Sequence, residues 1–314
     1  KVLITGGNGF LGTNLGLELV NYGFEVLLAS RNNKANFIAA RNTKCTVAPL
    51  DITNLNSVDD TICIYKPDIV IHAAATKFID LSEIYPHETI DVNILGSQNI
   101  ARSCIKNKVK YLIGISTDKA APPVRNTYGL SKALMERLFL GLANTSDTTI
   151  SCLRYGNVAW STGSVLVEWK RQAEQNNKII TCGPEMYRYL FTVQNACELV
   201  YRAIKNIDII NGKLLTLDMK AVKIRRLLET FCRLNKCKYE EVSPRQGERD
   251  TEFLIGEAEL AHASTIKLDE KKHYLIDFTQ NLKSSELEIK SPISAKTSTQ
   301  MNENEIENII KSGF

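Results

Sequence analysis

The sequence lacks the features that mark membrane proteins, metal proteins and nucleic-acid-binding proteins. No apolar run reaches the ~18 residues of a spanning helix, and no secretory signal peptide is visible. The four histidines show no ligand spacing, and no CxxC pair occurs among the 8 cysteines, so we expect no metal site. The net charge of +4 contains no dense basic run, and the aromatic residues do not interleave with Lys or Arg. We therefore expect neither nucleic acid nor a membrane as a partner.

The cysteines are scattered through apolar segments of a long chain, which is typical of reduced, buried thiols. This distribution favours a cytoplasmic protein. The chain opens at Lys1, inside a predicted strand and without an initiator Met, and we expect further residues upstream.

Short apolar runs alternate with longer helical segments through the first half of the chain. The predicted strands are 2–5, 24–29, 46–49, 69–74, 110–116 and 149–155. The predicted helices are 10–20, 55–65, 89–105 and 132–143. Regular alternation of this kind predicts the α/β class, with a doubly wound parallel sheet, right-handed crossovers and helices on both faces.

After Tyr155 the alternation loosens, which is typical of a substrate lobe added to such a sheet. Helices are expected at 193–204 and 221–234, and a strand at 238–242. We assign residues 1–156 and about 193–217 to a cofactor-binding domain, and 157–192 and 218–278 to a smaller substrate lobe. Residues 279–314 form a C-terminal tail. Within it, 281–299 is expected to be extended or partly disordered, and Asn302 caps a final helix, Glu303–Lys311.

A glycine-rich turn follows the first strand and opens the first helix. It reads Gly6-Gly7-Asn8-Gly9-Phe10-Leu11-Gly12. In dinucleotide-binding folds the first glycine permits the tight turn, the second lets pyrophosphate approach, and the third lets the helix pack on the strand. The phosphates then lie at the helix N-terminus. A glycine turn without a ligand is the alternative, but the strand and helix around this turn favour a cofactor site.

The end of the second strand indicates which cofactor is bound. Ser30-Arg31-Asn32 stands where NAD-specific proteins carry an acidic residue for the ribose hydroxyls. Arg31 can instead hold a 2′-phosphate, with Ser30 or Asn32 as a further donor, which favours NADP. Asp51-Ile52 is expected beside the adenine. The small residues Ala73-Ala74-Ala75 let the cofactor lie close, and the preceding His72 is interpreted as structural.

Two further motifs predict chemistry at the ends of strands. Tyr128 and Lys132 share one face of a helix, where Lys132 can bind the nicotinamide ribose and lower the pKa of Tyr128. Tyr128 can then exchange the proton of a substrate hydroxyl. Thr117-Asp118-Lys119 ends the fifth strand and adds an acid and an amine, which a simple reductase does not need.

Together these motifs resemble the UDP-N-acetylglucosamine 4,6-dehydratases, a group of extended short-chain dehydrogenases/reductases from bacterial polysaccharide pathways. The resemblance is strongest to the C5-inverting branch, and it covers roughly 2–255. It rests on Ser-Thr-Asp-Lys-Ala at 116–120, Tyr-Gly-x-Ser-Lys at 128–132 and His-Ala-Ala-Ala-Thr-Lys at 72–77. It also rests on Arg-Tyr-Gly-Asn-Val at 154–158, on Ser164-Val165, and on the segments 186–189 and 245–248.

The resemblance implies further contacts with NADP and with a UDP-sugar. For the cofactor these are Lys77, Asn93, Tyr155, Asn157 and Val158. For the substrate they are Lys77, Asn157, Ser164, Val165, Met186, Arg188, Arg245 and Glu248. The family also leads us to expect a homo-oligomer.

The implied mechanism begins with Tyr128 accepting the proton of the sugar C4 hydroxyl while hydride leaves C4. Lys119 then removes the C5 proton, and Asp118 or Tyr128 protonates the departing C6 hydroxyl. Thr117 would hydrogen-bond the C4 oxygen. An epimerase or reductase would need only Tyr128 and Lys132, and an NADP-binding sensor would not need that pair at all.

Overall fold

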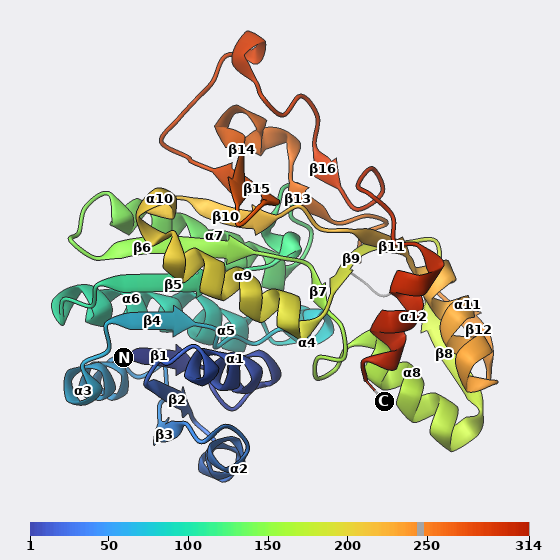
Figure 1. The fold of residues 1–314 in the computed structure, drawn as a ribbon, viewed down its shortest axis with the longest axis horizontal. Coiled ribbons are helices and arrows are strands. Elements are labelled where there is room, and N and C mark those ends of the chain that lie inside the picture. Colours follow the sequence, from blue (N-terminus) through green and yellow to red (C-terminus); the bar gives the residue numbers. More distant parts are fainter. Residues whose placement is uncertain (244–247, 314) are drawn as a thin grey trace.

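The structure is a computed structural model that describes residues 1–243 and 248–313. One large sheet has the strand order β14-β15-β10-β6-β5-β4-β1-β2-β3 (Figure 1). Its strands are β1 (Val2–Thr5), β2 (Val26–Ser30), β3 (Thr46–Pro49), β4 (Ile69–His72), β5 (Tyr111–Ile115), β6 (Thr149–Arg154), β10 (Leu214–Leu217), β14 (Ala263–Leu268) and β15 (Lys271–Ile276). The strands from β3 to β10 are parallel, whereas β15 pairs antiparallel with β10 and β14. The predicted α/β class and doubly wound parallel sheet are confirmed.

Helices cover both faces of this sheet. They are α1 (Phe10–Asn21), α2 (Asn33–Thr43), α3 (Leu55–Tyr65), α4 (Ile79–Ile84), α5 (Pro86–Thr89), α6 (Gly96–Lys106), α7 (Thr127–Ala143), α9 (Val193–Lys205) and α10 (Ile207–Ile210). Helix α1 packs with α2 and α9, and α6 packs with α3 and α7. The central strands β1 and β4 are buried along their whole length because helices shield both sides.

The helix expected at 89–105 contains an irregular turn. Between α5 and α6 the chain forms a π-helical segment, Ile90–Leu95, labelled η1. This segment carries Asn93, which is buried beside α7. Single π-helical turns inside a helix are frequent at functional sites, and the apolar periodicity of the sequence does not predict them.

A second core lies beside the carboxyl ends of the parallel strands. It involves α8 (Val165–Asn176), β8 (Lys178–Cys182), β9 (Tyr187–Phe191), β11 (Ala221–Lys223), α11 (Ile224–Asn235) and β12 (Lys238–Val242). Strand β7 (Asn157–Val158) pairs with β9, and its Val158 packs against the first core. The expected helix 221–234 was wrong at its start, because Ala221–Lys223 pair antiparallel with β9 before the helix begins. The strand 238–242 is as predicted and pairs with β8.

The C-terminal part of the chain is more ordered than its composition indicates. Residues 281–299 were expected to be extended or partly disordered, and within them strand β16 (Ile293–Ser294) is extended and pairs with β13 (Phe253–Ile255). Helix α12 (Glu303–Lys311) has the predicted bounds, and Asn302 caps it by accepting a hydrogen bond from the Glu305 amide. The apolar face of α12 packs beside α8 and α11 and completes the second core (Figure 1).

Strands β14 and β15 lie elsewhere than the sequence suggested. We assigned 218–278 to the smaller lobe, but these two strands extend the large sheet as an antiparallel hairpin. The hairpin pairs with β10 through Leu214–Leu217, a contact that local sequence pattern does not encode. The remaining division of the chain into two lobes stays a prediction.

Within the described residues, six of the cysteines are buried as expected, but Cys63 is exposed on α3. None of the helices described combines the length and the apolar character needed to cross a bilayer.

Candidate active site

A cavity of about 1260 Å³ lies over the carboxyl ends of β1, β2, β4, β5 and β6, between the two cores. This volume exceeds the ~300–1,000 Å³ of an ordinary small-molecule pocket, so it has room for two ligands. Most of the predicted site residues line it. They are Gly6, Asn8, Gly9, Phe10, Leu11, Gly12, Ser30, Arg31, Asn32, Ile52, Ala73, Ala74, Ala75, Lys77, Thr117, Lys119, Tyr128, Lys132, Tyr155, Asn157, Val158, Ser164, Val165, Met186, Arg188 and Glu248.

The glycine turn has a shape that side chains would obstruct. Gly6 has a φ of 68°, and a Cβ there would lie 2.9 Å from the Ala74 Cα. A Cβ on Gly12 would lie 2.5 Å from the Gly6 carbonyl oxygen. The backbone of β1, the turn and α1 can therefore meet only without these side chains, and the first turn of α1 faces the cavity. This geometry fits a dinucleotide whose pyrophosphate lies at the helix N-terminus.

The end of β2 presents one exposed cation to the same cavity. Arg31 is exposed, while the Ser30 hydroxyl accepts a hydrogen bond from the Asn8 amide at 3.2 Å. The Asn32 side chain caps α2 by accepting from the Ala35 amide at 3.0 Å. Asn32 is thus partly committed to the helix, whereas the charged Arg31 lines the cavity beside it.

His72 is a structural residue, as interpreted from the sequence. Its ring is fully buried and hydrogen-bonds the Thr5 hydroxyl at 2.8 Å and the Ser97 hydroxyl at 2.9 Å. Burial lowers the pKa of His72 to about 3, and the charge of Lys132 adds to this shift. The imidazole is therefore neutral at physiological pH.

Two residues that we expected to contact the cofactor lie outside the cavity lining. Asn93 is buried in the π-helical segment, where its amide donates to the Thr76 carbonyl and the Ser131 hydroxyl at 2.9 and 3.0 Å. It joins the segment after β4 to α7 and so acts behind the cavity wall. Asp51 accepts from the amide and hydroxyl of Thr53, which fixes a turn near the protein surface.

Tyr128 and Lys132 both line the cavity from the first turns of α7. Asn126 caps this helix by accepting from the Gly129 amide at 2.7 Å. Burial lowers the pKa of Lys132 to about 8. The expected lowering of the Tyr128 pKa by Lys132 stays a prediction. Burial raises the pKa of Tyr128, Asp118 adds to the rise, and Lys119 and a Thr117 hydrogen bond oppose it.

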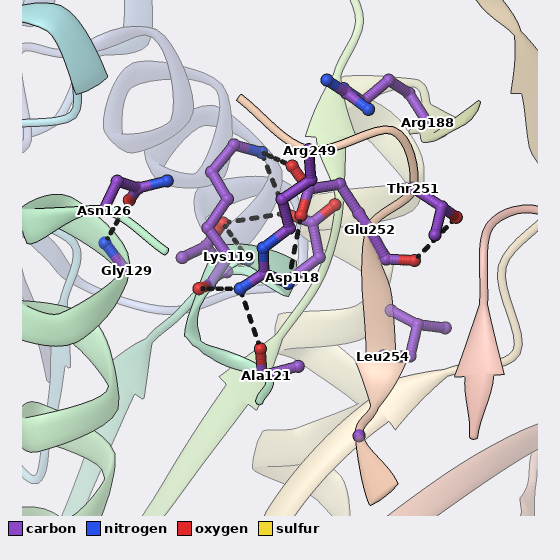
Figure 2. Close-up of polar contacts among 12 residues, drawn as sticks. Asp118, Lys119, Ala121, Asn126, Gly129, Arg188, Arg249, Thr251, Glu252 and Leu254 are labelled. Carbon is purple, nitrogen blue, oxygen red and sulfur yellow. Dashed lines mark hydrogen bonds and ion pairs between the residues drawn. The ribbon is translucent and has the colours of Figure 1, made fainter. Parts of the chain in front are cut away.

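Lys119 also faces the cavity, and its ammonium is surrounded by acceptors. The Nζ atom donates to Asp118 Oδ1 at 3.0 Å and lies 3.8 Å from Glu252 Oε1 (Figure 2). It also donates to Asn157 Oδ1 at 3.1 Å. Burial lowers the pKa of Lys119, but the two carboxylates outweigh that effect and raise it overall. Lys119 therefore carries a proton in this arrangement.

Asp118 lies behind the cavity wall, against our expectation that it meets the substrate. Its side chain is fully buried, and its Oδ1 accepts from Thr117 Oγ1 at 3.1 Å as well as from Lys119. Its Oδ2 points to Gly156, where a Cβ would lie 3.2 Å away. Asp118 is placed to hold Lys119 rather than to reach into the cavity.

Sequence reasoning missed two charged residues that the fold brings to Lys119. Glu252 lines the cavity, and the buried Arg249 donates from Nη2 to the backbone oxygens of Lys119 and Ala121 at 3.3 and 3.1 Å (Figure 2). Arg249 follows Glu248 directly and Glu252 lies four residues after it, so the segment that begins with the 245–248 motif extends further than we predicted. Nothing local in the sequence indicates that this segment meets the end of β5.

The predicted substrate residues line the far end of the cavity. Ser164 precedes α8, and Met186 and Arg188 lie at β9, with Arg188 Nη2 2.8 Å from Met186 Sδ. Glu248 Oε2 accepts from Cys182 Sγ at 3.6 Å. Arg245 lies outside the described residues.

The fold and the site define a Rossmann-type α/β protein of the extended short-chain dehydrogenase/reductase kind. The model of the polysaccharide biosynthesis protein family matches residues 2–274. A UDP-glucose 4-epimerase from Rickettsia bellii (strain OSU 85-389) is 35% identical over 281 residues, which cover 84% of this chain and 80% of that protein. The chain therefore belongs to the polysaccharide biosynthesis protein family.

Solved structures agree on the architecture. Pen from Bacillus thuringiensis is 26% identical with a TM-score of 0.88, and the match covers 99% of this chain and 96% of that one. DesIV, a dTDP-glucose 4,6-dehydratase from Streptomyces venezuelae crystallised with NAD and TYD, has a TM-score of 0.71 at 15% identity. That match covers 79% of this chain and 85% of DesIV, and it concerns the fold alone.

Proposed function

We propose that this protein is an enzyme that removes water from a UDP-N-acetylhexosamine, with UDP-N-acetylglucosamine as the first candidate. The product would be a UDP-4-keto-6-deoxy sugar with inverted C5, made in the cytoplasm for a surface glycan. One observation carries the proposal: Lys119, with Asp118 behind it, faces the same cavity as Tyr128 and Lys132. A reaction at C4 alone has no use for this additional amine.

The residues around the glycine turn fit NADP. Gly6, Gly9 and Gly12 leave the backbone open to pyrophosphate, and Arg31 is available for a 2′-phosphate. When bound, NADP+ supplies a hydride acceptor for C4 and returns the hydride at C6. The cofactor would stay bound between turnovers because the net reaction involves no change of oxidation state.

The side chains divide the work of proton transfer. Tyr128 takes the proton of the C4 hydroxyl, and Lys132 holds the nicotinamide ribose. Thr117, which lines the cavity, hydrogen-bonds the C4 oxygen. The 4-ketone acidifies the C5 hydrogen, and Lys119 removes it once its own proton has left. The presence of Lys119 beside Asp118 favours C5 inversion, because retaining relatives more often carry Asp-Glu at this position.

The direct test is incubation of the purified protein with UDP-N-acetylglucosamine, followed by mass spectrometry. Loss of one water from the nucleotide sugar supports the proposal. A product sugar of unchanged mass and altered C4 stereochemistry would contradict the proposal and support an epimerase.

The epimerase is the second candidate, because the curated relative from Rickettsia bellii bears that name at 35% identity. It would use Tyr128 and Lys132 and would leave Lys119 without a chemical task. A reductase of the same fold would instead consume NADPH in proportion to product. A non-enzymatic sensor would bind NADP and would convert no UDP-sugar.

A homo-oligomer is also proposed, and a group of exposed apolar side chains supports it. They lie on α4, at Tyr85 beside it, and on α7, helices that pack against each other, and they are Leu81, Ile84, Tyr85, Leu130 and Leu134. Exposed apolar side chains gathered on neighbouring helices commonly mark a protein contact. Sedimentation velocity of the purified protein tests this.

A further inference from the structure

Lys119 is held in a form that cannot act directly as a base. Its Nζ has three side-chain oxygens around it, from Asp118, Asn157 and Glu252. A lysine ammonium has three donors and no acceptor, so this environment suits the protonated form. The proposed abstraction at C5 therefore requires a nearby group that takes the lysine proton first.

The two carboxylates beside Lys119 differ in their access to the cavity. Asp118 is fully buried and already accepts hydrogen bonds from Thr117 and Lys119. Glu252 is 3% exposed, yet it contributes to the cavity lining, and its Oε1 lies 3.8 Å from Lys119 Nζ. Glu252 is therefore the carboxylate that can meet both the lysine and a bound sugar.

We infer that Glu252 is a catalytic acid–base residue that exchanges a proton with Lys119 and with the departing C6 hydroxyl. The inference rests on the proposed dehydration and identifies the group that protonates O6.

The proton count closes within the pair. Lys119 ammonium first passes its proton to the Glu252 carboxylate, which leaves a neutral amine and a carboxylic acid. The amine takes the C5 proton, and the C5–H electrons form the C5–C6 double bond as the C6–O bond breaks. Glu252 gives its proton to O6, which leaves as water. Lys119 is again an ammonium and Glu252 a carboxylate.

Arg249 holds Glu252 in this position. Its guanidinium is buried and anchored to the backbone oxygens of Lys119 and Ala121, and its Nη1 lies 3.5 Å from Glu252 Oε2. In the described part of the chain, Glu252 Oε2 has no hydrogen bond that meets normal geometry. Arg249 thus ties the carboxylate to the turn that carries Lys119 while leaving it able to change protonation state.

The C-terminal segment fixes the backbone of Glu252. Its carbonyl accepts from the Ala295 amide at 2.8 Å, and the neighbouring Thr251 hydroxyl accepts from the Lys296 amide at 3.1 Å. Strands β13 and β16 continue this pairing. Contacts between two segments about 40 residues apart, 251–255 and 293–296, therefore hold the Glu252 carboxylate at the end of β5.

The test uses Glu252→Gln in the full chain, with Asp250→Asn as the matched control. Asp250 is an exposed carboxylate two residues away in the same segment. Each protein is mixed with NADP+ and UDP-N-acetylglucosamine in a single turnover. NADPH absorbance reports oxidation at C4, mass spectrometry reports loss of water, and deuterium uptake reports exchange at C5.

We expect Glu252→Gln to form NADPH at the parent rate but to lose water at least ~100-fold more slowly, as for loss of a general acid. Asp250→Asn should match the parent in all three measurements. Glu252→Asp should recover part of the water loss, because it restores the carboxylate at a greater distance. If Glu252→Gln does not bind NADP or fold, Glu252→Asp carries the test, with slowed water loss and normal C4 oxidation expected.

A second readout is the pKa of Lys119, which NMR of the ¹³C-labelled lysine measures. The charged and titratable groups around it are Asp118, Glu252, Arg188 and Tyr128. Removal of one of the two carboxylates should lower the pKa of Lys119 in Glu252→Gln.

Three results overturn the inference. Water loss by Glu252→Gln at the parent rate would mean that another group protonates O6. Equal slowing of C4 oxidation and water loss would reduce Glu252 to a residue that positions the whole site. If the parent protein itself removes no water from any UDP-hexose, the proposed function fails together with the inference. In the first two results the parent protein still removes water, so only the role of Glu252 fails.

Discussion

Arg154 is the centre of a buried ionic network beside the candidate site. Its fully buried guanidinium makes five hydrogen bonds, to Glu136 at 3.0 and 2.6 Å, to Glu259 at 2.9 and 2.8 Å, and to the Leu254 carbonyl at 2.9 Å. Glu136 also accepts from Ser116, just before the Thr117 turn. The network therefore joins β6, α7, β13 and the residues that follow β13.

We predict that Arg154→Met destabilises the protein by roughly 3–5 kcal/mol, the usual cost of removing one partner of a buried ion pair. Both carboxylates are 2% exposed and would remain buried without a counter-ion. Burial acts to lower the pKa of Arg154, but Glu136 and Glu259 raise it well above its ordinary value, which reflects the strength of the pairing. Urea unfolding at pH 7 measures the loss.

Two comparisons make this prediction specific. Arg202→Met removes a cation whose partner, Asp269, is half exposed, and it should cost only ~0–1 kcal/mol. The triple variant Arg154→Met, Glu136→Gln, Glu259→Gln should regain part of the stability, because no net charge stays buried. Equal losses for Arg154→Met and Arg202→Met would refute the reasoning.

Three further predictions concern the cavity. Arg31→Asp should weaken the binding of NADP relative to that of NAD by ~2 kcal/mol, because a charge-assisted contact is lost, and calorimetry measures both affinities. Equal affinity of the parent protein for the two cofactors would contradict this. Tyr128→Phe should keep cofactor binding and lower turnover at least ~100-fold, and a variant with nearly full activity would show that α7 is not catalytic. Lys119→Ala should still form NADPH with the sugar but neither lose water nor exchange the C5 hydrogen, and exchange at the parent rate would mean that another residue is the base.

The parallel sheet could be predicted because its signals are local. Val2–Thr5 and Thr46–Pro49 were predicted with the bounds observed, since short runs of strand-forming residues between turns are local signals. The helix at Glu303–Lys311 was equally clear from its cap and apolar spacing. By contrast, Ala221–Lys223 became a strand because β9 offered it a partner, and partners in distant sequence cannot be found from local pattern.

The sequence by itself determined the chemistry available at the site: a glycine turn, a Tyr128–Lys132 pair on one helix face and an acid beside an amine after β5. Each is written within a few neighbouring residues, where backbone geometry dictates their placement. Only the tertiary structure decided how those groups are placed relative to one another. It buried Asp118 behind the wall and brought Glu252 to within 3.8 Å of Lys119 across more than 130 residues of chain. Charge interactions depend on distance and burial in space, so the protonation of Lys119 is a property of the fold and not of its motif.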